Sequence, residues 1–99
     1  MGSSELSAVK SLLRQALVRM LKAAAWPLSG EVPQWQSEAR RLRGDGADRF
    51  SPSMRQRLDL DLIYRQARHI MPENHDGQEP LPVDCVCPVT LDELLGDES

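Results

Sequence analysis

Apolar residues recur at steps of three and four positions through the first 25 residues, which is the spacing of one face of an α-helix. Leu12 and Val18 fall outside this stripe, so the apolar surface of the helix is wider than one partner helix covers. Trp26-Pro27 ends the helix, because the residue before a proline avoids helical geometry. We expect Trp26 and Trp35, which flank the following turn, to pack together. The stripe supplies our candidates for the core or for an association interface, which are Leu6, Val9, Leu13, Leu17, Met20 and Leu21.

A second segment with helical spacing begins at Pro33, a residue that suits the first turn of a helix. Glycines at positions 44 and 46 then lower the helix propensity, and on propensity alone the helix would end near Arg43. Yet Phe50 continues the apolar stripe in phase. Periodicity therefore leaves two alternatives, a helix that stops at the glycines and a helix that runs through them. The stripe before the glycines consists of Trp35, Ala39 and Leu42.

The third segment starts at Ser51-Pro52, a serine cap followed by proline in the first helical position. The apolar spacing predicts one continuous helix from Pro52 to about Met71, and Pro72 closes it. One ridge of this helix is formed by Met54, Leu58 and Leu62.

Prolines dominate residues 72–88, which predicts an extended and irregular connection. Thr90 followed three positions later by Glu93 reads as a capping box at the start of a short helix over residues 89–96. Leu91, Leu94 and Leu95 give that helix an apolar face that has to dock on the body of the molecule. The expected architecture is an all-α bundle of three main helices plus this short C-terminal helix. It forms a single domain over residues 1–99, with a helical body over 1–71.

Four segments of the chain carry a family resemblance, and their spacing matches as well. They are Met1–Glu5 leading into Ala8–Leu13 and Met20–Lys22, Trp35 followed by Arg43, Phe50–Arg55 followed by Tyr64 and Ala67–Arg68, and Cys87–Leu95. Together they resemble a bacterial family, domain of unknown function 29. The resemblance implies an all-helical fold and a second helix that continues past Gly44 and Gly46, with packing overriding propensity. It implies no catalytic residue, because the family has no established activity.

The chain departs from the family pattern in two ways. Val89 stands where the family usually has an aromatic residue, which weakens the anchor of the last helix. Family members also carry further helices before the point where this chain starts, so we expect an N-terminally shortened member. If those helices pack on the first helix, its wide apolar face is uncovered here, and large exposed apolar patches mark interfaces. We therefore expect non-catalytic protein association, as a homodimer or with an unidentified protein partner that supplies the missing helices.

Charge is distributed unevenly along the chain. Residues 1–68 hold all twelve Lys and Arg against seven acidic residues, a balance of +5, whereas residues 69–99 hold eight acidic residues and no Lys or Arg. The simplest interpretation is that the acidic end folds back and neutralises the body. The alternative is nucleic-acid binding through an arginine-rich face, which takes second place because the net charge is −3. The candidates for such a face are Arg40, Arg41, Arg43, Arg55, Arg65 and Arg68.

The residue types that bind metals or form nucleophiles do not occur in a usual spacing. The plausible metal ligands are His69, His75, Asp84, Cys85 and Cys87, and a Cys-x-Cys pair lacks the two-residue gap of common zinc sites. Gly44-Asp45-Gly46 is not a phosphate-binding loop, because it lacks the full glycine pattern and a preceding strand. A cysteine nucleophile needs a base and an orienting group, and neither is evident. We expect no metal, no cofactor and no enzymatic activity.

The cellular location follows from what the chain contains. Two cysteines at positions i and i+2 are not a disulfide framework, and reduced thiols fit a cytoplasmic protein. The first residues lack the basic and apolar regions of a secretory signal. No stretch approaches the roughly 20 apolar residues that span a bilayer. We expect a cytoplasmic protein without membrane contact.

Overall fold

The computed structural model describes residues 2–84 and 86–95. Its helical elements are α1 (Gly2–Ala25), α2 (Val32–Arg49), the 3-10 helix η1 (Pro52–Arg57), α3 (Leu60–Ile70) and α4 (Leu91–Leu95). The described residues contain no strand, and one isolated bridge joins His75 and Gln78. The predicted all-α fold is therefore confirmed. Within this part of the chain, no helix is both long enough and apolar enough to cross a membrane.

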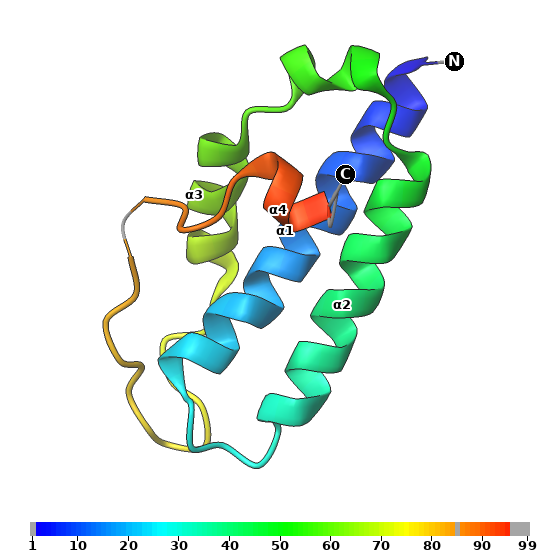
Figure 1. Cartoon of the computed structure of the whole chain (residues 1–99). Coiled ribbons are helices and arrows are strands. Elements are labelled where there is room, and N and C mark those ends of the chain that lie inside the picture. The colour runs from blue at the N-terminus through cyan, green and yellow to red at the C-terminus, as the bar shows by residue number, and fades with distance from the viewer. Residues whose placement is uncertain (1, 85, 96–99) are drawn as a thin grey trace.

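The long helices are arranged around α1, which packs against both α2 and α3. Figure 1 shows α2 and α3 on different sides of α1, with α4 lying across the front between them. The proline-rich connection leaves the lower end of α3 and returns along the same side of the molecule to α4 (Figure 1). This arrangement places α4 as a cover over the core.

Helix α2 is continuous through both glycines, as the family resemblance implies and as propensity alone does not. Gly46 is buried against α1, and a Cβ atom built on it would lie 3.3 Å from Leu13 Cδ2. The absence of a side chain at Gly46 therefore allows the two helices to approach closely. Gly44 faces the other way and has no neighbouring atom within 4 Å of a built Cβ.

The expected continuous helix from Pro52 to Met71 is wrong. Leu58 and Asp59 have extended backbone geometry, and they separate η1 from α3. The Asp59 carboxylate accepts a hydrogen bond from the Leu62 amide at 3.2 Å, which makes Asp59 the N-cap of α3. The three residues expected to form one ridge of this helix therefore differ in burial. Met54 and Leu58 are buried, whereas Leu62 is 43% exposed.

The predicted capping box of α4 is confirmed. The Glu93 amide donates to Thr90 Oγ1 at 3.1 Å, and the Thr90 amide donates to Glu93 Oε1 at 2.8 Å. At the other end of α4, the Arg43 guanidinium donates to the carbonyls of Glu93 and Leu94, each at 2.7 Å. Helix α4 is thus held at both ends. Gly96, the expected terminator of this helix, lies outside the described residues.

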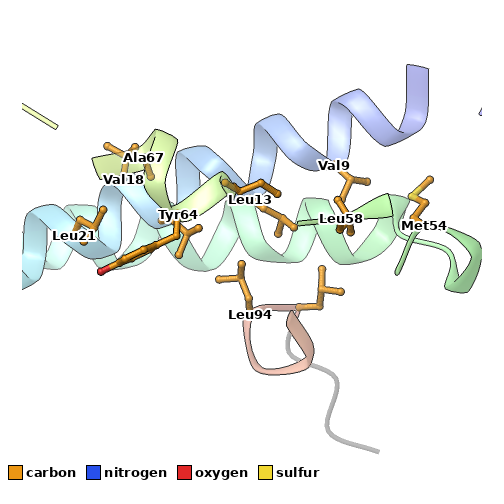
Figure 2. Close-up of a cluster of buried hydrophobic side chains, with 12 residues drawn as sticks. Val9, Leu13, Val18, Leu21, Met54, Leu58, Tyr64, Ala67 and Leu94 are labelled. Atoms are coloured by element: carbon orange, nitrogen blue, oxygen red, sulfur yellow. The ribbon is translucent and has the colours of Figure 1, made fainter. Parts of the chain in front are cut away.

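The core joins residues from every helical element. Figure 2 shows Leu94 reaching from α4 toward α1, and Met54 and Leu58 beside Val9. Leu94 is fully buried and Leu95 is 8% exposed, so α4 docks through its leucines as its sequence predicts. A second cluster forms at the other end of α1 around Trp26 and Trp35, whose ring centroids are 6.5 Å apart. The expected packing of the two tryptophans is confirmed.

Candidate functional site

The apolar stripe of α1 is covered by the chain itself. Val9 and Leu13 are fully buried, and Leu17 and Leu21 are 1% and 5% exposed. The expectation that this face lies open is therefore corrected, because α2, α3 and α4 close over it and make these four residues core. The two remaining interface candidates, Leu6 and Met20, are half-buried at the edges of the same core. Association remains a prediction, but it needs a different surface.

A broad groove runs between the first half of α1 and the last turns of α2. Its volume is about 820 Å³. Leu12, which falls outside the buried stripe, lies half-buried in this groove. Glu5 Oε2 and Arg49 Nη1 are 3.5 Å apart at one end of it. The lining combines small and apolar side chains with charged ones, and consists of Glu5, Ala8, Ser11, Leu12, Asp45, Asp48 and Arg49.

Leu6 and Met20, the half-buried residues at the edges of the apolar stripe of α1, each line a smaller hollow. Leu6 lines a hollow of about 620 Å³ beside Met54 and Arg57. Met20 lines a largely apolar hollow of about 290 Å³ between α1, Tyr64 of α3 and the proline-rich connection. Each of these hollows opens beside the core, so these two candidates retain partial access to solvent.

The six candidate arginines do not form one face. Arg43 binds the carbonyls of α4, and Arg55 pairs with Asp92 at 2.6 Å while its guanidinium lies 5.7 Å from the centre of the Phe50 ring. The Arg55–Asp92 pair shows the acidic end of the chain engaging the basic body. The others are divided between helices on different sides of α1, namely Arg40 and Arg41 on α2 and Arg65 and Arg68 on α3 (Figure 1). Nucleic-acid binding thus stays a prediction of the sequence.

The cysteine that the structure describes is a packing residue. The Cys87 thiol donates to the Val89 carbonyl at 3.3 Å. Burial raises the pKa of this thiol, and the negative charge of Asp61 raises it further. A raised pKa lowers the fraction of nucleophilic thiolate. Cys85, the other candidate, lies outside the described residues.

His75 is part of a cluster that sequence reasoning missed. Its ring centroid lies 5.5 Å from that of Trp26 and 5.1 Å from that of Trp35. Its Nε2 atom lies 2.9 Å from Glu31 Oε2 and 3.5 Å from Asp76 Oδ2. Among the described residues, these three side chains are the group of potential metal ligands that the fold brings together. His69, by contrast, is exposed at the end of α3.

The Trp26–Trp35–His75 contact depends on a tight turn in the connection. His75 and Gln78 exchange backbone hydrogen bonds of 3.0 and 2.9 Å around Asp76 and Gly77, which both have positive φ angles, 52° and 78°. The Trp26 indole donates to the Gln78 carbonyl at 2.9 Å and fixes the turn against α1. Asn74 and Gly77 indicate a turn in the sequence, but no sequence signal links His75 to Glu31.

Comparison with known proteins supports the fold and leaves the activity open. The sequence matches the model of a family described as Domain of unknown function DUF29 over residues 1–98. The fold is similar to the crystal structure of an alpha-helical protein of unknown function from Rhodospirillum rubrum, with a TM-score of 0.76 and 25% identity. The match covers 99% of this chain and 64% of that one, so this chain spans less than two thirds of its solved relative. No curated protein matches the sequence significantly.

Proposed function

This chain belongs to the DUF29 family, and we propose that it acts by non-catalytic protein association, as a two-fold homodimer closed through the groove between α1 and α2. The observation that carries the proposal is the position of Leu12. It lies on the part of the apolar surface of α1 that the chain's other helices leave half-open. A second helix seated there would complete its burial.

The shape of the groove suits a helix from a second copy. Ala8 and Ser11 are small, and they flank Leu12 on the exposed face of α1. Small side chains let another helix approach, and Leu12 supplies apolar area that is stabilising when removed from water.

The groove holds three carboxylates and one guanidinium, so its charges constrain how two copies can face each other and do not by themselves drive the contact. Asp45 and Asp48 lie on its α2 side together with Arg49, and Glu5 lies opposite. In a two-fold interface the same patch meets itself, so that residue i of one copy contacts residue j of the other and the reverse. Arg49 of each copy can then face the acidic residues of the other. Complementary charges of this kind fix the orientation of an interface more than they strengthen it.

The test is the oligomeric state of the full chain, measured by light scattering coupled to size exclusion and by sedimentation. We expect a dimer at high micromolar concentration, and we expect Leu12→Arg to convert it to a monomer. Leu28→Arg is the matched control, because Leu28 is 96% exposed in the loop after α1 and does not line the groove. Circular dichroism confirms that each variant is folded. A wild-type monomer at high micromolar concentration, or a dimer that survives Leu12→Arg, overturns the proposal.

A further inference from the structure

We propose that His75, Glu31 and Asp76 bind a divalent transition-metal ion such as zinc. The site lies at the junction between the proline-rich connection and the start of α2. The donor atoms of the three side chains lie within 4.8 Å of one another. The site is independent of the dimer groove, because none of its residues lines that groove. The three ligands come from two segments of the chain that are far apart in sequence.

The distances from the His75 ring nitrogen to the two carboxylates are close to those in a coordination shell. Zinc binds imidazole nitrogen and carboxylate oxygen at about 2.1 Å, so two ligands at angles between 90° and tetrahedral lie about 3.0–3.4 Å apart. His75 Nε2 is 2.9 Å from Glu31 Oε2 and 3.5 Å from Asp76 Oδ2. The third distance, between the two carboxylates, is at most 4.8 Å, and the exposed Glu31 and Asp76 side chains can adjust to bring all three donors onto one ion. One histidine and two carboxylates give three protein ligands and leave a position for water.

The balance of donors and acceptors around His75 also indicates a cation. Three oxygen atoms approach the same ring nitrogen, since Ser29 Oγ lies 3.3 Å from Nε2 in addition to the two carboxylates. A ring nitrogen carries at most one proton to donate, so it cannot donate to both carboxylates at once, whereas the Ser29 hydroxyl can itself be a donor. Even a protonated histidine offers one positive charge against two carboxylates. A divalent ion neutralises both carboxylates and accepts the lone pair of Nε2 at the same time.

The surroundings hold the histidine in place before any ion binds. The ring is packed against Trp26 and Trp35, and the His75 side chain is 21% exposed. The turn that carries His75 is fixed by the hydrogen bond from the Trp26 indole to the Gln78 carbonyl. Glu31 precedes the first residue of α2, so its backbone is held by that helix. Glu31 and Asp76 remain 50% and 83% exposed, which leaves the ion a path from solvent.

The fluorescence of Trp26 and Trp35, which lie beside His75, reports whether a metal ion binds. Chelator-treated protein is titrated with Zn²⁺ by calorimetry, and with Co²⁺ or Ni²⁺ by tryptophan fluorescence, because these paramagnetic ions quench a nearby indole. We expect binding of one ion per chain, quenching that EDTA reverses, and a thermal midpoint that rises with zinc concentration, since a ligand that binds the folded state stabilises it.

Substitutions decide whether the named side chains are the ligands. His75→Asn and the double variant Glu31→Gln with Asp76→Asn should each weaken zinc binding at least tenfold. The double variant keeps the test decisive if His75→Asn fails to fold, because its side chains are the more exposed ones. His69→Asn is the matched control and should bind as the wild type does. Absence of saturable binding to the wild-type chain overturns the proposal, and so does a double variant that binds zinc normally.

Discussion

The two glycines of α2 permit a sharp test of the helix packing. Both lie inside the same continuous helix, so alanine at either position gains the same intrinsic helix propensity, about 0.8–1.0 kcal/mol. At Gly44 nothing lies within 4 Å of the added Cβ. Gly44→Ala should therefore raise the free energy of unfolding by about 1 kcal/mol.

At Gly46 the same gain is opposed by a steric cost. The added Cβ would lie 3.3 Å from Leu13 Cδ2 and 3.8 Å from Leu12 Cβ. Leu13 is fully buried, so it has little room to move aside. Inserting a methyl group into a well-packed core costs about 1–3 kcal/mol. We expect Gly46→Ala to be about 1 kcal/mol less stable than the wild type, and about 2 kcal/mol less stable than Gly44→Ala.

Urea unfolding followed by far-ultraviolet circular dichroism measures both variants. Thermal unfolding gives a second measure, because in a domain of this size 1 kcal/mol corresponds to about 4–8 °C in the thermal midpoint. The unfolding midpoints of the two variants should therefore shift in opposite directions from that of the wild type by a resolvable amount. If Gly46→Ala were as stabilising as Gly44→Ala, the close contact between α1 and α2 would be refuted. If Gly44→Ala gave no gain, the continuity of α2 at that position would be refuted.

Three further predictions concern polar groups. Arg43→Ala should destabilise the chain by about 1–2 kcal/mol and increase hydrogen exchange in residues 91–95, because it removes two charge-assisted hydrogen bonds to α4; exchange that is unchanged there would contradict this role. Cys87, studied in a Cys85→Ser background, should react more slowly with iodoacetamide at mildly alkaline pH than the same thiol in urea, because burial raises its pKa; equal rates would argue against it. The Arg19 guanidinium, 2.8 Å away, and then Gln34, lower the pKa of the Glu38 carboxyl, so its contribution to stability is present above the unfolded-state pKa and is lost as the pH falls through the folded-state pKa. Glu38→Gln should accordingly be slightly less stable than wild type at neutral pH and equal to it in acid, and a difference that persists in acid would contradict the ion pair.

Local signals in the sequence predicted local structure well. The Thr90 to Glu93 spacing gave the capping box, and Trp26-Pro27 gave the end of α1, because each signal lies within one turn of the backbone that it determines. The break before α3 also has a local signal, Asp59 three residues before Leu62. The regular spacing of Met54, Leu58 and Leu62 concealed it, since the same pattern fits one unbroken helix.

Features that depend on contacts between distant segments could not be predicted in this way. The periodicity of α1 identifies an apolar face, but it cannot tell whether the chain's own helices or a partner cover Val9 and Leu13. The continuity of α2 depends on Gly46 meeting Leu13, a contact that helix propensity does not contain. Likewise, the cluster of Glu31 and His75 forms because the connection folds back to the tryptophans, and no spacing in the sequence encodes that approach.

The proline-rich connection is anchored to the helical body, and this affects how α4 docks. Helix α4 binds the body as an intramolecular ligand at the end of a linker. Hydrogen bonds from the Trp26 indole to Gln78, from the Leu81 amide to Ala25, and from the Tyr64 hydroxyl to Asp84 fasten the linker along its length. They shorten its free part from about 20 residues to about six, which lowers the entropy cost of closing the loop by about 1 kcal/mol. The local concentration of α4 at its docking site rises accordingly. Loss of all three hydrogen bonds would therefore weaken the docking of Leu94 and Leu95 by about 1 kcal/mol.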